Sequence, residues 1–229
     1  MSESAEGGYR FERKYHISEV PTAEVEHWVR RSPALFSEVY APRFVNNIYL
    51  DRPGLAAYFQ NLNGLADRTK LRIRWYGALL GPMAKPVLEF KIKRGMVGTK
   101  EFFPLKPFTL ARGFGIGDLR PVLDDSPLPA AVRVELGEVE PALINRYHRK
   151  YFVSADGTYR ITVDSGLEFY RVHRHDNQFL SRSTLPDSTV MELKYSGAIA
   201  ALDDRITNFF PFRVTRMSKY VSGLEGVEG

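Results

Sequence analysis

One four-residue pattern, an apolar residue followed by Glu, any residue and Lys, occurs three times in the sequence. It reads Phe11-Glu12-Arg13-Lys14, Leu88-Glu89-Phe90-Lys91 and Met191-Glu192-Leu193-Lys194. Residues two apart lie on the same face of an extended strand, so each copy predicts a carboxylate beside an ammonium group. Carboxylate oxygens are ligands for divalent metals, and ammonium groups attract the phosphates that such metals accompany. The pattern therefore points to the chemistry of a bound anion.

Basic residues recur at the same period of two elsewhere in the chain. Arg72 and Arg74 are two apart, and so are Lys91 and Lys93. Like charges on one face of a strand repel each other unless an anion lies between them, and the planar guanidinium group suits bidentate contact with phosphate. Ten cations and four carboxylates occupy such faces: Glu12, Lys14, Arg72, Arg74, Glu89, Lys91, Lys93, Arg149, Arg160, Asp164, Glu192 and Lys194, with Arg216 and Lys219 near the C-terminus.

These charged faces allow two interpretations. They form either the solvated side of an ordinary antiparallel sheet or the lining of a closed tunnel whose apolar faces are covered by helices. The repeated pattern and the neighbouring cations favour the tunnel. A positively charged interior is stable only when it holds water and a polyanion. We therefore expect an α+β protein, mainly antiparallel β, with a charged interior and helices packed outside.

Alternation of apolar and polar residues locates the strands that carry these charges. It predicts strands at residues 10–17, 44–50, 70–76, 88–94, 99–105, 145–153, 159–164, 169–173 and 190–195. Spacings of three and four predict helices at residues 22–31, 53–61 and 197–209, which are available to cover apolar faces. Small helices are expected between residues 109 and 136.

The composition of the 229 residues limits what the chain can do. With 44% apolar residues it can bury a sizeable core, which we expect to be one domain over residues 9–225, between a flexible lead (1–8) and a tail (226–229). A net charge of +5 favours a polyanionic partner. The absence of cysteine excludes disulfides and thiolate sites. Neither a signal peptide nor an apolar segment of membrane length is present, so a soluble, cytoplasmic protein is expected.

Other chemistries find weaker support in the sequence. The five histidines lack zinc-site spacing, the glycine-rich segment 113–117 lacks the lysine of a phosphate-binding P-loop, and no serine stands in a nucleophile-elbow pattern. Nucleic-acid binding competes for any basic protein, but alternating charges of mixed sign fit it less well than one basic stripe would. We expect no nucleic-acid partner.

A set of short segments runs in order from about Tyr9 to Glu225. It comprises residues 11–15 (FERKY), 47–51 (NIYLD), 71–77 (LRIRWYG), 88–91 (LEFK), 147–149 (YHR), 160–164 (RITVD), 191–194 (MELK) and 218–223 (SKYVSG). Together these segments resemble the polyphosphate polymerase domain of the vacuolar transporter chaperone (VTC) family. That family belongs to the triphosphate tunnel metalloenzymes, together with the CYTH proteins.

The resemblance implies a closed antiparallel tunnel of about eight strands that binds a triphosphate. It also implies transfer of the terminal phosphate of ATP to a growing polyphosphate chain, assisted by Mn²⁺ or Mg²⁺. Glu192 is implied as a metal ligand, and the repeated pattern adds Glu12 and Glu89 as candidates. Membrane helices and an inositol-phosphate-sensing domain, which eukaryotic members carry, have no counterpart in this sequence. The phosphate-binding role carries over to Lys14, Arg72, Arg74, Lys91, Tyr147, Arg149, Arg160 and Lys219.

Three further phosphate-binding candidates rest on other grounds. Lys93 and Lys194 follow from their places on charged faces, whereas Arg216 stands where the family is expected to use lysine. In the expected reaction the attacking phosphate oxygen is already anionic, so no strong base is needed. Catalysis would come from alignment and charge neutralisation by Arg72, Arg74, Arg149, Arg160 and Lys14.

Two alternative functions use the same predicted tunnel. In the first, water replaces the polyphosphate chain as nucleophile, and the protein hydrolyses inorganic or nucleoside triphosphates. In the second, the protein binds polyphosphate or a nucleotide without turning it over. The reaction product separates these alternatives: chains longer than the substrate, free phosphate, or none.

Overall fold

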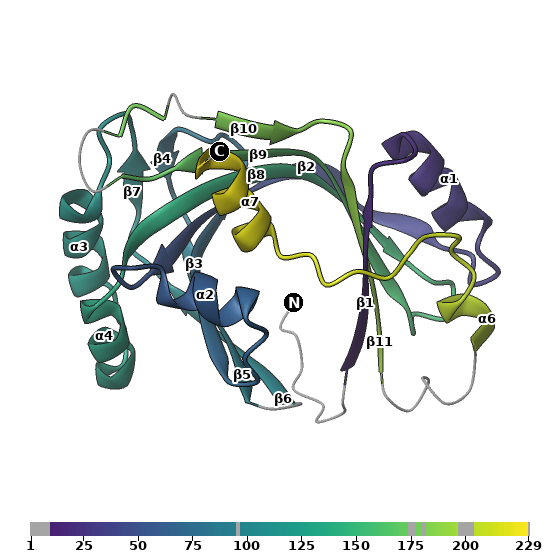
Figure 1. Ribbon diagram of the computed structural model, residues 1–229, viewed down its shortest axis with the longest axis horizontal. Coiled ribbons are helices and arrows are strands. Elements are labelled where there is room, and N and C mark those ends of the chain that lie inside the picture. Colours follow the sequence, from purple (N-terminus) through teal and green to yellow (C-terminus); the bar gives the residue numbers. More distant parts are fainter. Residues whose placement is uncertain (1–9, 95–96, 174–176, 180–181, 197–203, 229) are drawn as a thin grey trace. The chain divides into compact units, whose positions relative to one another are not determined.

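The computed structural model describes residues 10–94, 97–173, 177–179, 182–196 and 204–228 (Figure 1). The strands are β1 (Arg10–Ile17), β2 (Ser37–Asp51), β3 (Arg68–Tyr76), β4 (Gly81–Met83), β5 (Val87–Arg94), β6 (Val97–Pro104), β7 (Phe108–Leu110), β8 (Glu140–Val153), β9 (Arg160–Arg171), β10 (Arg182–Leu185) and β11 (Thr189–Ser196). The helices are α1 (Thr22–Arg31), α2 (Ala56–Leu62), α3 (Ile116–Asp125), α4 (Ala130–Gly137), α6 (Asp204–Thr207) and α7 (Lys219–Glu228).

Most predicted strands are confirmed, and several are longer than expected. β2 begins at Ser37 rather than at Phe44, and β8 begins at Glu140 rather than at Asn145. β9 joins the two strands predicted at 159–164 and 169–173. Gly166 explains this last difference. It has a φ of 58°, which glycine adopts without strain, so the chain can turn locally inside β9 without ending the strand.

The main sheet has the order β1-β11-β9-β8-β2-β3-β5-β6, with β10 paired to β9, and β4 and β7 form a separate pair. Each strand pair whose register is known is antiparallel, which confirms the predicted class. The predicted closure is wrong for the described residues, because β1 and β6 end this order and do not pair. The outer edge of β1 is instead contacted by Val214, which bridges to Tyr15, and by the Thr215 amide, which donates to the Lys14 carbonyl at 2.7 Å.

The chain forms two compact units. Unit 1 comprises residues 1–43, 148–166 and 186–217, and unit 2 comprises residues 44–147, 167–185 and 218–229. Strands β2, β8 and β9 each pass from one unit into the other. The expectation of one domain over residues 9–225 stays a prediction.

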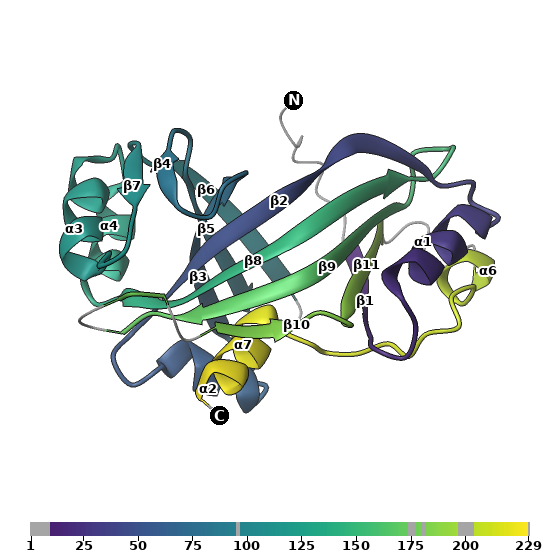
Figure 2. The same ribbon diagram turned by 90° about the horizontal axis from the view of Figure 1, so that it is seen from above.

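Unit 1 has its own hydrophobic core beneath helix α1. Tyr15 and Ile17 of β1 pack there with alternate residues of β9 and β11, such as Ile161 and Leu193. Helix α1 contributes Val25 and Val29, so its predicted role as a cover is confirmed. Figures 1 and 2 both place α6 next to α1, and Ile206 of α6 joins the same core. A helix was predicted at residues 197–209, and α6 (Asp204–Thr207) accounts for its described helical part. Residues 197–203 lie outside the described residues.

Unit 2 has a second core, which is covered by helices α3 and α4. Leu71, Ile73 and Trp75 alternate along β3 and are all buried in it. Leu119 and Leu123 of α3 and Val132 and Leu136 of α4 complete the cover. The two helices lie side by side in both views (Figures 1 and 2).

Helix α2 does not cover this core, contrary to the sequence expectation. It begins at Ala56 rather than Pro53, and none of its residues is buried. Its first turn is capped from β2, because the Asp51 carboxylate accepts hydrogen bonds from the amides of Ala57 and Tyr58. The helix is therefore held by its N-terminus and not by an apolar face.

Candidate anion-binding site

The polar face of β3, β5 and β6 in unit 2 gathers cations from three strands. In the strand register, Arg68 lies opposite Lys93, and Lys70 lies opposite Lys91, which in turn lies opposite Lys100. Directly paired residues of antiparallel strands share a face. Burial of the apolar face of β3 in the core therefore leaves the opposite face to its basic residues. The cations on this face are Arg68, Lys70, Arg72, Arg74, Lys91, Lys93 and Lys100.

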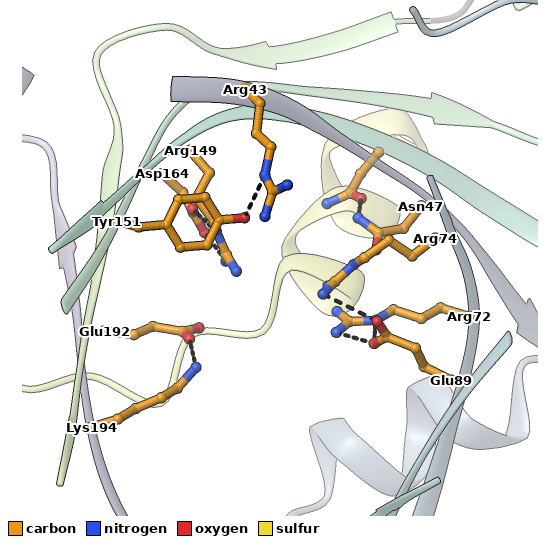
Figure 3. A network of polar contacts seen from close by, with 11 residues as sticks. Arg43, Asn47, Arg72, Arg74, Glu89, Arg149, Tyr151, Asp164, Glu192 and Lys194 are labelled. Carbon is orange, nitrogen blue, oxygen red and sulfur yellow. Dashed lines mark hydrogen bonds and ion pairs between the residues drawn. The ribbon is translucent and has the colours of Figure 1, made fainter. Parts of the chain in front are cut away.

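Glu89 is the carboxylate that these three strands place on that face among the described residues. Arg72 Nε donates a 2.7 Å hydrogen bond to Glu89 Oε2, and Arg74 Nη1 lies 3.1 Å from Glu89 Oε1 (Figure 3). Burial acts to raise the pKa of Glu89, but the charges of Arg72 and Arg74 lower it below its ordinary value. Burial likewise acts to lower the pKa of Arg72, and attraction to Glu89 raises it. The Arg72 guanidinium and the Glu89 carboxylate are thus held in their charged forms.

Two buried asparagines fix the position of Arg74. Arg74 Nε donates to Asn47 Oδ1 at 3.0 Å, and Asn47 Nδ2 donates to Asn145 Oδ1 at 2.8 Å. Both amides are fully buried, so the chain of hydrogen bonds has no competition from bulk water. The Nδ2 atom of Asn145 has no hydrogen-bond partner among the described residues. Arg74 is therefore held by Asn47 on one side and by Glu89 on the other.

The start of helix α7 brings two predicted residues of unit 2 together. Lys219 Nζ lies 4.8 Å from the centre of the Tyr147 ring, which is a cation–π distance. Just before it, Ser218 Oγ accepts a 3.0 Å hydrogen bond from Lys70 Nζ. Tyr220 OH donates to Asp51 Oδ2 at 2.6 Å, and burial, followed by the charge of Asp51, raises the pKa of Tyr220. These contacts anchor α7 by its first turn.

The carboxylates and lysines of unit 1 form a second cluster on β1 and β11. The register places Glu12 opposite Lys194 and Lys14 opposite Glu192. Lys14 Nζ lies 3.1 Å from Glu192 Oε1 and 3.5 Å from Glu12 Oε1. Lys194 Nζ lies 3.0 Å from Glu192 Oε2, as Figure 3 shows. The two copies of the repeated pattern therefore interlock across the strand pair.

Arg149 forms a buried ion pair in unit 1. Its Nε and Nη2 atoms donate to the two carboxylate oxygens of Asp164, at 2.5 and 2.7 Å, and Asp164 is fully buried. Such a bidentate pair fixes the guanidinium plane and compensates its charge. Asp164 was expected on the charged face, and its role there is to orient Arg149.

Two other predicted cations of unit 1 lie at the surface. Arg160 is exposed at the start of β9, opposite Lys194 in the register. Arg216 is exposed and follows the segment that contacts the edge of β1. Arg160 thus lies opposite Lys194, a member of the cluster on β1 and β11. Arg216 follows two residues after Val214, which contacts the edge of β1.

The predicted metal ligands are divided between the two units. Glu12 and Glu192 both contact Lys14 in unit 1, and Glu89 belongs to unit 2, where it is paired with Arg72 and Arg74. No group of three or more His, Cys, Asp or Glu residues suited to a metal occurs among the described residues. Two neighbouring carboxylates still fit Mg²⁺ or Mn²⁺, since such ions are commonly held by one or two carboxylates together with substrate phosphates. Glu12 and Glu192 are thus the pair that fits.

Sequence reasoning missed several residues that the register adds to these clusters. Lys70 shares the alternation of Arg72 and Arg74 and could have been included on that ground alone. Lys100 could not, because its place depends on the pairing of β5 with β6. Asn47 and Asn145 were detectable only as polar residues inside apolar strands. The hydrogen bond from Arg43 Nε to Tyr151 OH, at 3.3 Å, could not be predicted from the sequence.

This chain resembles several known proteins. The family model of the VTC domain matches residues 9–227. A search of curated proteins finds no match. Among solved structures, a candidate adenylate cyclase from Vibrio parahaemolyticus has a TM-score of 0.51 at 14% identity, covering 95% of this chain and 99% of its own. A protein of Pyrococcus horikoshii OT3 has a TM-score of 0.51 at 13% identity, with the same coverage.

A third structure, a candidate adenylyl cyclase from Hippeastrum described with a dominant triphosphatase activity, has a TM-score of 0.49 at 16% identity, covering 95% of this chain and 96% of its own. The TM-scores of the first two structures show that they share the fold of this chain. At identities this low, the shared fold carries nothing about the activity of this chain. None of the helices in the described part of the chain is both long and apolar enough to cross a membrane.

Proposed function

Because the chain belongs to the VTC domain family, we propose that it is a polyphosphate polymerase. In this proposal the terminal phosphate of ATP is transferred to the end of a growing inorganic polyphosphate chain. The fold shared with the Vibrio and Pyrococcus proteins is compatible with this activity but does not select it.

The observation that supports the proposal best is the cation-rich face of unit 2. Lys70, Lys91 and Lys100 lie directly opposite one another on adjacent strands, where like charges are unfavourable. On the same face of these strands, among the described residues, Glu89 contributes a negative charge, and it is paired with Arg72 and Arg74. A bound polyanion would be attracted by the excess of positive charge on this face. An extended chain of phosphates, which carries charge along its whole length, suits a face of this kind.

The residues of the chain would act mainly by positioning and by charge neutralisation. A terminal oxygen of the polyphosphate attacks the γ-phosphorus of ATP, a new P–O bond forms, the bond to the β-phosphate oxygen breaks, and ADP leaves. The attacking oxygen is anionic, so no proton has to be removed. Arg74, fixed by Asn47 and Glu89, has the rigid geometry that stabilises developing charge most effectively.

Glu192 and Glu12 would hold a Mg²⁺ or Mn²⁺ ion, which would supply charge neutralisation at phosphate oxygens. Lys14 and Lys194, which contact these carboxylates, would attract the phosphates that accompany the metal. Arg149 keeps a fixed orientation through its two hydrogen bonds to Asp164, which suits a guanidinium group that positions an anion.

The test incubates the purified full chain with ATP and either Mn²⁺ or Mg²⁺ and resolves the products on a gel. We expect polyphosphate longer than the substrate, and none after the metal is chelated. Removing one cation that contacts the transferred phosphate should lower kcat by roughly 10²–10³-fold in Arg72→Ala, by analogy with a lost oxyanion-hole donor. Arg94→Ala is the matched control, because Arg94 lies on the opposite face of β5.

Two outcomes would contradict the polymerase, and a third would contradict the proposed site. Release of free phosphate alone would assign the chain as a triphosphatase, and tight triphosphate binding without turnover under any metal would assign it as a binding module. Equal activity of the wild type and of a folded Arg72→Ala protein would exclude the cation-rich face of unit 2 as the site. Circular dichroism spectra of both variants establish that they fold.

A further inference from the structure

The N-terminal half of β2 is exposed along its whole length. Residues 37–44 are all exposed, whereas residues 45–51 are all buried. Within this exposed half, in unit 1, Tyr40 is 59% exposed to solvent. A single exposed ring is ordinary on a protein surface, so the side chains around Tyr40 decide what it can bind.

Tyr40 belongs to a compact group of flat side chains. Its ring meets the ring of Tyr151 edge-on, with centroids 5.6 Å apart and planes at 87°. The guanidinium carbon of Arg43 lies 6.0 Å from the Tyr40 ring centre and 4.9 Å from that of Tyr151. Arg43 Nε also donates to Tyr151 OH at 3.3 Å, which holds the guanidinium beside the rings (Figure 3). We call Tyr40, Arg43 and Tyr151 the ring cluster.

The ring cluster adjoins a predicted phosphate-binding residue of the same unit. The guanidinium carbon of Arg149 lies 5.8 Å from the Tyr151 ring centre. Because Asp164 fixes the plane of Arg149, the spacing between this cation and the ring cluster is also fixed. The molecule that such an arrangement suits carries phosphates at one end and a flat ring at the other.

We propose that the ring cluster binds the base of the nucleoside triphosphate donor, with the base stacked on the exposed Tyr40 ring and the Arg43 guanidinium. Aromatic rings and guanidinium planes stack on any nucleobase, since every base presents a π-face. This inference rests on the proposed function and adds which part of the nucleotide the protein recognises besides its phosphates. The protein discriminates a nucleoside triphosphate from inorganic tripolyphosphate but discriminates weakly among bases.

Binding measurements that compare ATP with inorganic tripolyphosphate test the proposal, because only ATP carries a base. Each ligand is titrated by calorimetry into the wild type, Tyr40→Ala and Tyr40→Phe. Loss of one stacked base weakens binding by roughly five- to a hundredfold. We expect a loss in that range for ATP in Tyr40→Ala, no loss for tripolyphosphate, and near-wild-type ATP binding in Tyr40→Phe, which keeps the ring. GTP should behave like ATP.

A matched control and the opposing outcomes complete the test. Phe59→Ala removes a ring of similar exposure on α2, in unit 2, and should change neither affinity. Equal weakening of both ligands in Tyr40→Ala, or unchanged ATP binding, overturns the base site. A wild type that binds tripolyphosphate but not ATP overturns it too. These results are separate from polymerase activity, because a protein that binds ATP through its base and yet makes no polyphosphate retains the base site and loses the proposed function.

Discussion

At the scale of single residues, the repeated Glu residues have different surroundings although their sequence context is the same. Glu89 contacts two arginines, whereas Glu192 contacts two lysines and shares one of them with Glu12. Two planar guanidinium groups, one on each carboxylate oxygen, hold Glu89 more rigidly than ammonium contacts would. We therefore assign Glu89 to the positioning of Arg72 and Arg74, and we keep Glu192 and Glu12 as the proposed metal ligands.

The pKa of Glu89 makes a prediction about stability. Since its folded pKa lies below the ordinary value of about 4.3, the stabilisation by ionised Glu89 is complete above that pH and is lost as the pH falls through the folded pKa. Glu89→Gln should lower the free energy of unfolding at pH 7 by about 1.5–3 kcal/mol, the range for hydrogen bonds to charged groups. The difference between the two proteins should shrink with acidification.

Urea unfolding of the wild type and Glu89→Gln, at steps from neutral to strongly acidic pH, measures this difference. The difference isolates Glu89, because every other acidic group titrates in both proteins. A difference that stays constant over the whole pH range would show that Glu89 is not stabilised by its charge.

At the scale of elements, helix α7 is held by a close approach that only glycine allows. A Cβ atom on Gly223 would lie 2.6 Å from Leu143 Cδ2 and would also overlap the Phe169 ring. With the contact between Tyr220 and Asp51, this packing places Lys219 against Tyr147. Figures 1 and 2 show α7 next to α2, whose first turn the same Asp51 caps. Asp51 therefore supports both helices.

Gly223→Ala should push α7 away from β8 and β9 of unit 2. Overpacking of this kind costs about 1–3 kcal/mol of stability, and displacement of Lys219 should lower triphosphate affinity as well. Gly117→Ala in α3 is the control, because nothing lies within 4 Å of the Cβ position there. Thermal unfolding and calorimetric titration with tripolyphosphate measure the two effects. If Gly223→Ala matches Gly117→Ala in both, α7 is not held by this contact.

At the scale of the whole molecule, each of the two units combines one hydrophobic core with one polar cluster. The cores bury one face of the strands, and the opposite face holds the charges. The chain as a whole carries a net charge of +5. Such an excess attracts polyanions at long range, and salt screens this attraction.

The affinity for tripolyphosphate should therefore depend on salt. Raising KCl from about 50 mM to about 300 mM shortens the screening length and should weaken binding at least about threefold. Arg72→Ala, which has one cation fewer, should show a shallower dependence, while Arg94→Ala keeps more of it because Arg94 lies on the other face of β5. Titrations at several salt concentrations measure the slopes. A slope of zero in the wild type would rule out charge as the basis of binding.

The amino-acid sequence by itself determined which residues share a face. Leu71, Ile73 and Trp75 are buried, and Arg72 and Arg74 are partly exposed on the opposite face, as the alternation predicted. This follows from the geometry of an extended chain, which is local and needs no tertiary information. The strand class, helix α1, the small helices α3 and α4 and the cation-rich faces were all predictable for that reason.

Only the tertiary structure decided which charges meet and where the sheet ends. The pairings of Arg72 with Glu89, of Lys14 with Glu192 and of Asn47 with Asn145 join residues far apart in the chain, and they depend on strand register. The edge of the sheet also depends on a distant segment, because Val214, near the C-terminus, contacts the edge of β1. The expected closure of the sheet could not take this contact into account. Register and edge contacts come from packing between distant segments, and the periodicity of one strand carries no information about its partner.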